Sequence, residues 1–253
     1  MLLLTILPLV IYGLIWGSFL TVVGLRTPIN QPFVFSRSHC PHCHHILSSK
    51  ELVPLFSILF QKGKCRHCHR PIALLYPLAE LATSCLLVIG FLWVQPDWPA
   101  FTSLFLVLSF GIVFSISDLT TQILPDKIML LFLLFVFLHQ LFTRPDIFFS
   151  YLICGIGFFS FFYLFFHIFP YGIGGGDVKY YGILGFLLGY QTTALALLLA
   201  CSIACTVYLP VRFIKKHNRN HPIPFAPFIF LGAYISCLIS PLFFTYLNSY
   251  FLF

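Results

Sequence analysis

Long apolar runs constrain the fold of this chain more than any other feature of its sequence. The runs are residues 2–25, 73–94, 101–117, 128–143, 147–169, 181–211 and 225–253. A helix needs about 20 mostly apolar residues, with roughly 17 as a lower limit, to cross the hydrocarbon core of a bilayer. The sequence therefore predicts an all-α polytopic membrane protein, in which the run at 101–117 is of marginal length.

The composition agrees with lipid as the solvent for most of the chain. Only 8% of the residues are charged and 59% are hydrophobic, whereas about a quarter of the residues in a soluble domain are charged. This excludes an ordinary soluble domain, a disordered protein, a coiled coil and a secreted disulfide scaffold. Because no basic residue precedes the run at 2–25, we expect it to be a retained span and not a cleaved secretory signal.

Basic residues gather in two short loops between apolar runs. Seven of the fourteen Lys and Arg residues lie in the loop at 26–72. The second cluster consists of Arg212, Lys215, Lys216 and Arg219. Nucleic acid is one partner for such residues, but the positive-inside rule is the better explanation for short loops between spans. We therefore expect no nucleic-acid partner and predict that both loops face the cytoplasm.

This topology requires a break within the run at 181–211. An even number of crossings must separate residue 180 from the basic loop at 212–224, yet 31 residues are too many for one upright span and too few for two. A short or re-entrant stretch at 181–190, broken near Gly189 and followed by a full span at 192–211, meets both conditions. About eight membrane segments result.

The loop at 26–72 contains two Cys-x2-Cys pairs, Cys40 with Cys43 and Cys65 with Cys68. This spacing is typical of a zinc ribbon, in which each pair contributes two thiolates to a tetrahedral ion. The loop has too few apolar residues for a core of its own, so a metal would supply folding free energy. Two disulfides, or thiols without a metal, are the alternatives. Four neighbouring histidines are alternative ligands: His42, His44, His67 and His69.

Two of the seven acidic residues stand at the boundaries of apolar runs. Asp118 closes the third run, and Asp177 follows three glycines. An ionisable side chain at a membrane boundary is costly enough to suggest a function. If two carboxyl groups meet, they share a proton, and the pair can activate a water molecule while protonating a peptide carbonyl. Capping of helix ends and ion pairs with Lys127 or Lys179 are the alternatives.

The segments around these aspartates resemble the motifs of type IV prepilin peptidases. Gly174-Gly175-Gly176-Asp177-Val178-Lys179 fits the G-x-G-D-x-K motif of that family, and Asp118 with Ile123-Leu124-Pro125-Asp126 fits its other aspartate motif. The resemblance extends over nearly the whole chain, in the same order. Its other segments are Gly17-Ser18-Phe19-Leu20, Arg26-Thr27-Pro28, the two cysteine pairs, Tyr76-Pro77-Leu78-Ala79-Glu80 and Pro224-Phe225-Ala226-Pro227-Phe228.

The resemblance implies a bifunctional enzyme of the inner membrane that serves a type IV pilus or a competence system. Such an enzyme cuts the short basic leader from prepilins or pseudopilins at the cytoplasmic face, and then methylates the new amino terminus with S-adenosylmethionine. By this resemblance Asp118 and Asp177 are the catalytic residues. The supporting residues are Gly174, Gly176, Lys179 and Asp126, and Glu80 is a candidate for methyl transfer. A second role for Asp126 is that of a helix amino-terminal carboxylate.

We expect three regions: a first span at 1–25, a Cys-rich loop at 26–72 associated with methyl transfer, and a peptidase domain at 73–253. One rival hypothesis is another GxGD protease that cuts transmembrane helices, but the ribbon-like loop and the Pro-Phe segment argue against it. A proton- or cation-coupled transporter is disfavoured because both acids lie at one boundary and no internal repeat is evident. A non-catalytic assembly factor would not need two intact aspartate motifs.

Overall fold

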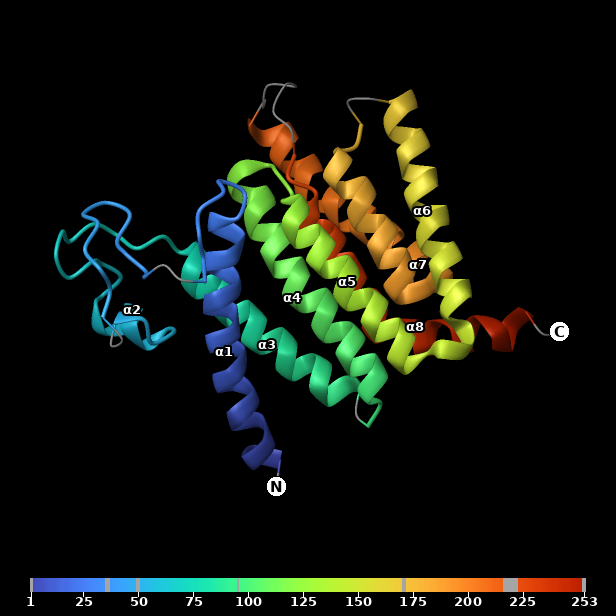
Figure 1. The fold of residues 1–253 in the computed structure, drawn as a ribbon, viewed down its shortest axis with the longest axis horizontal. Coiled ribbons are helices and arrows are strands. Elements are labelled where there is room, and N and C mark those ends of the chain that lie inside the picture. The colour runs from blue at the N-terminus through green and yellow to red at the C-terminus, as the bar shows by residue number, and fades with distance from the viewer. Residues whose placement is uncertain are drawn as a thin grey trace.

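The computed structural model describes residues 2–34, 37–48, 51–94, 96–169, 172–215 and 223–251. Its helices are α1 (Leu2–Arg26), α2 (Phe56–Phe60), α3 (Leu75–Val94), α4 (Trp98–Thr121), α5 (Asp126–Thr143), α6 (Phe148–Ile168), α7 (Gly175–Lys215) and α8 (Ala226–Phe251), with a 3-10 turn, η2, at Pro145–Ile147. In the described ranges, extended backbone pairs only in two isolated bridges of the Cys-rich loop. The predicted all-α class is confirmed (Figure 1).

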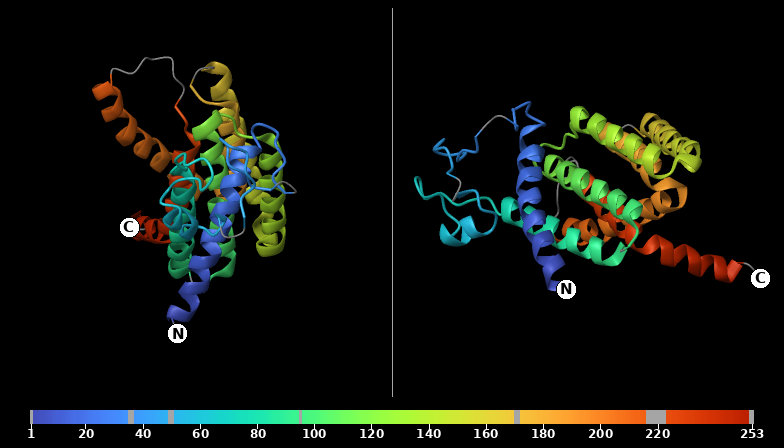
Figure 2. Two further views of the ribbon diagram at one scale, coloured as in Figure 1. Left: turned by 90° about the vertical axis from the view of Figure 1, so that its left-hand side faces the viewer. Right: turned by 60° about the horizontal axis from the view of Figure 1, so that its bottom comes forward.

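Within the described residues, six helices are long and apolar enough to cross a membrane, namely α1, α3, α4, α5, α6 and α7. Helix α8 adds a shorter apolar stretch, Ala226–Ser240. The figure of about eight membrane segments therefore stays a prediction. The Cys-rich loop, with α2, lies to one side of the bundle next to α1 (Figures 1 and 2).

The prediction that the run at 101–117 is of marginal length is wrong, because α4 has 24 residues. The helix continues through polar residues at both ends. Asp97 caps its start by accepting a hydrogen bond from the Ala100 amide at 3.1 Å. Near its end, the hydroxyls of Thr120 and Thr121 donate to helical carbonyls at 2.8 Å. An apolar run marks only the part of a helix that lies among apolar neighbours, so it underestimates the length here.

Helix α4 is the centre of the bundle. It packs against α1, α3, α5 and α8, and 72% of its apolar window is buried, compared with 11% for α6. The end of α4 and the starts of α5, α7 and α8 lie together at one end of the bundle (Figure 1). The segments that carry the two aspartate motifs therefore share one end of the molecule, as the topology predicts.

Helix α7 is broken at Gly189, where φ is 74°. This positive φ is readily available to glycine but not to residues with a side chain. The break divides α7 into a first arm (175–188) and a second arm (190–215), and both outer ends lie at the same end of the bundle (Figures 1 and 2). The predicted break is confirmed. The first arm begins at Gly175, before the predicted start at 181, because the motif residues are helical too.

Gln140 of α5 stabilises this break. Its side chain is fully buried, and its Nε2 donates to the carbonyls of Phe186 at 2.9 Å and Leu187 at 2.8 Å. These carbonyls precede the break by two or three residues, where a helix end leaves acceptors without an intrahelical partner. Gln140 therefore holds the carboxyl-terminal end of the first arm of α7, the arm that begins with the Asp177 motif.

We predict that Gln140→Leu lowers the melting temperature of the purified protein by several degrees. The substitution removes two buried hydrogen bonds, each of which contributes about 0.5–1.5 kcal/mol to stability. Gln191→Leu is the matched control, because Gln191 is exposed on the other side of the break, and we expect it to melt like the wild type. Thermal unfolding in detergent measures both variants. Equal melting of all three proteins would show that Gln140 does not stabilise the break.

Candidate active site and metal centre

Asp118 lies in the last turn of α4, and only 8% of its surface is exposed. Its Oδ2 accepts a hydrogen bond from the backbone N–H of Ala226 at 2.9 Å. Ala226 is the first residue of α8, and the first amides of a helix have no partner within that helix. The Pro-Phe segment thus has a physical role, because it presents a free amide to Asp118. Sequence reasoning missed this contact, since a backbone donor leaves no signature in the sequence.

Asp177 lies in the first turn of α7, and the two glycines of its motif permit close packing there. Its amide donates to the Gly174 carbonyl at 3.0 Å. A Cβ placed on Gly174 would lie 3.2 Å from Oδ2 of Asp177, and one placed on Gly176 would lie 2.9 Å from the side chain of Leu124. Leu124 belongs to the connection between α4 and α5. Gly176 therefore lets the start of α7 come close to the connection that follows α4.

The structure brings Asp118 and Asp177 together at one end of the bundle. The Asp118 carboxyl is close enough to act electrostatically on Asp177, and Asp118 also receives the amide of α8. Asp118 is in the last turn of α4 and Asp177 in the first turn of α7, and these two helix ends lie near the start of α8 (Figure 1).

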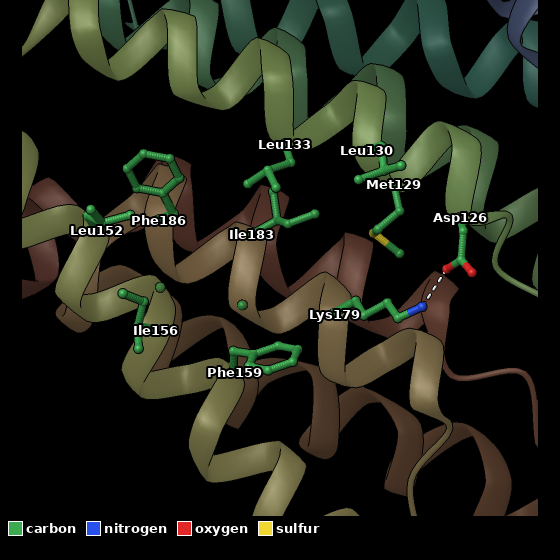
Figure 3. A pocket seen from close by; sticks show the side chains of 12 residues that line it. Asp126, Met129, Leu130, Leu133, Leu152, Ile156, Phe159, Lys179, Ile183 and Phe186 are labelled. Atoms are coloured by element: carbon green, nitrogen blue, oxygen red, sulfur yellow. Dashed lines mark hydrogen bonds and ion pairs between the residues drawn. The ribbon is translucent and has the colours of Figure 1, made fainter.

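The two lysines considered as ion-pair partners for these aspartates have other contacts. Lys179 pairs with Asp126 at 2.5 Å, and the Lys127 ammonium reaches Oδ1 of Asn30 at 3.5 Å. Asp126 is the first residue of α5, the position predicted for a helix amino-terminal carboxylate. The pair joins the start of α5 to the first arm of α7 (Figure 3). Since both side chains are largely exposed, it contributes at most about 1 kcal/mol to stability.

The four cysteines of the loop converge into one cluster. The sulfurs of Cys40, Cys43, Cys65 and Cys68 all lie within 4.8 Å of one another, with 3.8 Å between Cys40 and Cys68 and 4.0 Å between Cys43 and Cys65. Zinc–sulfur bonds of about 2.3 Å in a tetrahedron place the sulfurs about 3.8 Å apart. The thiols therefore fit a zinc ion as they stand. All nine cysteines, each within the described residues, are free.

The two cysteine pairs have the same backbone conformation. In each, the amide four residues after the first cysteine donates back to its carbonyl, from His44 to Cys40 at 3.0 Å and from His69 to Cys65 at 2.9 Å. Both histidines have a positive φ, of 56° and 55°. The cluster is formed by sulfur atoms and not by imidazole nitrogens, which favours four thiolates over histidine ligands.

The thiols cannot all ionise easily without a cation. Backbone hydrogen bonds from Cys43 and His42 lower the pKa of Cys40 to about 7. A backbone hydrogen bond from His45 also lowers the pKa of Cys43, but burial and the neighbouring sulfurs outweigh it and raise that pKa to about 11. A divalent cation would remove the repulsion between neighbouring thiolates, because a thiol that coordinates a metal is deprotonated.

Glu80 anchors the Cys-rich loop to the membrane helices. Its side chain is buried in α3, and its Oε2 accepts a hydrogen bond from the Leu55 amide, just before α2, at 3.0 Å. Helix α1 approaches closely here, because a Cβ on Gly17 would lie 3.0 Å from the Cα of Glu80 and 2.9 Å from Thr83. Small residues allow such close approach of membrane helices. The candidate for methyl transfer thus has a structural partner that the sequence did not reveal.

We predict that Glu80→Leu speeds amide hydrogen exchange in residues 51–60. The substitution leaves the Leu55 amide without its acceptor, at a cost of about 1–3 kcal/mol. Glu80→Gln keeps a carbonyl oxygen at the same place and should exchange almost as slowly as the wild type. Exchange followed by mass spectrometry measures the three proteins. Unchanged exchange in the leucine variant would contradict the anchoring role.

Comparison with known protein families gives one match for the amino-terminal part of the chain and one for the part that follows it. The family model described as Bacterial Peptidase A24 N-terminal domain matches residues 11–94. The model described as Type IV leader peptidase family matches residues 105–209. The first match covers most of α1, the Cys-rich loop and α3, and the second covers the stretch that carries both aspartates.

Several curated relatives match over most of their length. A prepilin leader peptidase/N-methyltransferase of Bacillus subtilis (strain 168) is 32% identical over 230 residues, which is 91% of this chain and 92% of that protein. Proteins of the same name from Aeromonas hydrophila and Pectobacterium carotovorum subsp. carotovorum are 29% and 30% identical, over 90% and 91% of this chain and 88% and 91% of their own length. No solved structure matches. This chain therefore belongs to the type IV leader peptidase family.

Proposed function

We propose that this chain, a prepilin-processing enzyme by its family, is an aspartic endopeptidase whose catalytic pair is Asp118 and Asp177. The observation that carries the proposal is their convergence at one end of the bundle, where Asp118 acts electrostatically on Asp177. Their motifs lie within the match to the type IV leader peptidase model. The substrates are prepilins or pseudopilins, as the names of the curated relatives suggest.

The proposed reaction needs one ionised and one protonated carboxyl group. The carboxylate takes a proton from a water molecule, whose oxygen then attacks the carbonyl carbon of the scissile bond, while the protonated acid donates its proton to the carbonyl oxygen. As the carbon–nitrogen bond breaks, the acid that took the proton from water gives it to the nitrogen, and the other acid regains its proton from a hydroxyl of the intermediate, so that the pair returns to its starting state. The Ala226 amide orients Asp118 for this exchange.

We place the catalytic pair at the cytoplasmic face of the inner membrane. Helix α1 ends at Arg26, where the basic loop begins, and this end lies at the same end of the bundle as the end of α4 and the start of α7 (Figure 1). The positive-inside rule assigns that end to the cytoplasm. A substrate whose apolar helix lies in the bilayer and whose basic leader lies in the cytoplasm would present its scissile bond at this level.

A second activity is proposed for the amino-terminal part of the chain. The new amino terminus of the cleaved substrate would take a methyl group from the sulfonium of S-adenosylmethionine, releasing a proton and S-adenosylhomocysteine. The names of the curated relatives support this activity. We propose a structural zinc ion at the four cysteines, which would stabilise the folded loop. Glu80 would serve the reaction by holding this loop against the membrane helices.

We expect the purified enzyme in lipid vesicles to remove the leader of a prepilin-like substrate. Mass spectrometry of the product reads the cleavage site, and with S-adenosylmethionine present the product should gain about 14 Da per methyl group. An intact substrate after incubation with folded enzyme would overturn the peptidase proposal and favour the alternative, a proton- or cation-coupled transporter that uses the same aspartates. Cleavage without the added mass would overturn methyl transfer alone.

A further inference from the structure

A groove lies between α5 and α6, with the first arm of α7 as its floor (Figure 3). Its volume is about 540 Å³. Most of its lining is apolar, and among the side chains that form its walls and floor are Met129, Leu130, Leu133, Ile156, Phe159 and Ile183. Its two charged residues, Asp126 and Lys179, form the ion pair described above and lie together at one end (Figure 3).

The size of the groove indicates what it can accommodate. A helix with its side chains is about 10–12 Å across and rises 5.4 Å per turn, so a volume of 540 Å³ encloses only about one turn. A helix would therefore lie along the groove and insert the side chains of one face. Apolar grooves that receive one face of a helix are a recurrent mode of recognition.

The charged end of the groove is next to the catalytic pair. Lys179 follows Asp177 by two residues in α7, so the two side chains leave the helix on opposite sides, about 200° apart. A chain that ran from the groove to Asp177 would pass over the start of α7, where Gly174 and Gly175 are exposed and have no side chain. Three extended residues reach about 10 Å, which is the width of the helix.

We propose, on the basis of the function proposed above, that this groove docks the apolar helix of the substrate. The helix starts at the Asp126–Lys179 end, and the few residues between the helix and the scissile bond cross over Gly174 and Gly175, so that the leader lies beyond the two catalytic aspartates. The charges fit this occupant. An exposed ion pair is weakly held, so the amino-terminal end of the docked helix, which carries partial positive charge, can replace Lys179 as the partner of Asp126 at little cost.

Photo-crosslinking tests the position of the substrate. A photoreactive phenylalanine analogue replaces Leu133 or Ile156, both in the groove, in the Asp118→Asn background so that the substrate persists. The matched controls place the analogue at Leu134 and Ile153, which are at least as exposed (52% and 68%, against 40% and 57%) but lie outside the groove. The two groove positions should capture a prepilin-like substrate in vesicles about tenfold more than the controls. Equal capture at all four positions, or capture of lipid alone, would overturn the proposal.

Filling the groove tests its contribution to turnover. Ile156→Trp should raise the KM for a substrate with its apolar helix about tenfold and leave kcat unchanged, because it removes binding that is equal in the ground and transition states. Ile153→Trp is the control and should not change KM. A soluble leader peptide without the helix should be cut equally well by both variants. If Ile156→Trp does not change cleavage of the substrate with its helix, the docking proposal is wrong and the proposed function still stands. If the wild-type enzyme cuts no substrate, the proposed function is wrong.

Discussion

Asp118→Asn and Asp177→Asn should each slow leader cleavage by about 10³-fold or more, because an amide can neither accept nor release the proton that the reaction needs. The geometry should persist in both variants. The amide oxygen of an asparagine at 118 can still accept the Ala226 N–H, which holds the end of α4 to the start of α8. Mass spectrometry of a time course in vesicles gives the rates, and thermal unfolding shows that the variants are folded.

Asp97→Asn is the matched control for these two substitutions. Asp97 caps the other end of α4 by accepting the Ala100 amide at 3.1 Å, and asparagine caps helices as well as aspartate does. This variant should therefore cleave the leader at the wild-type rate. If either of the other two variants also cut at the wild-type rate, that residue would not belong to the catalytic pair.

Cys40→Ser and Cys65→Ser should each release the metal and unfold the Cys-rich loop. The two substitutions remove one thiolate from different pairs of the cluster, whose sulfurs all lie within 4.8 Å of one another. Structural zinc contributes about 10–16 kcal/mol to the folding of small zinc-binding peptides, and the sequence of this loop has too few apolar residues for a core that would compensate. We expect metal analysis to find one zinc per wild-type chain, and hydrogen exchange in residues 37–48 to rise sharply in the variants.

Cys85→Ser is the control for the metal experiment. Cys85 is an exposed cysteine of α3, outside the cluster, so this variant should keep its zinc and its slow exchange. A wild-type protein that contains no metal, yet has an ordered loop and methylates its product, would show that the cluster works as free thiols.

The sequence predicted the class of fold because lipid-exposed helices must be apolar along most of their length. It failed at helix ends. The apolar run at 101–117 stops where Asp118 begins the last turn of α4, but that turn is helical although its residues are polar; the hydroxyls of Thr120 and Thr121 are satisfied by the carbonyls of Ile116 and Ser117. The break at Gly189 was predictable from length and charge, whereas its stabilisation by Gln140 required the neighbouring helix to be in place.

Candidate site residues were identifiable where their chemistry is rare in the surrounding sequence. Carboxylates are few in an apolar chain, and cysteine pairs with regular spacing stand out, so Asp118, Asp177 and the four cysteines were found. Their partners were not. The amides of Ala226 and Leu55, which bond Asp118 and Glu80, belong to the backbone and occur at every residue except proline. Only the three-dimensional structure shows which backbone amide donates to each carboxylate.

The hydrogen bond between Asp118 and Ala226 determines how much of the chain an independently active protease must contain. The region matched by the type IV leader peptidase model ends at residue 209, yet one of the two acids is held by the opening residue of α8. A fragment cut at that boundary would keep both acids and lose the donor that orients one of them. With the catalytic role that we propose for Asp118, the smallest competent unit extends past residue 226.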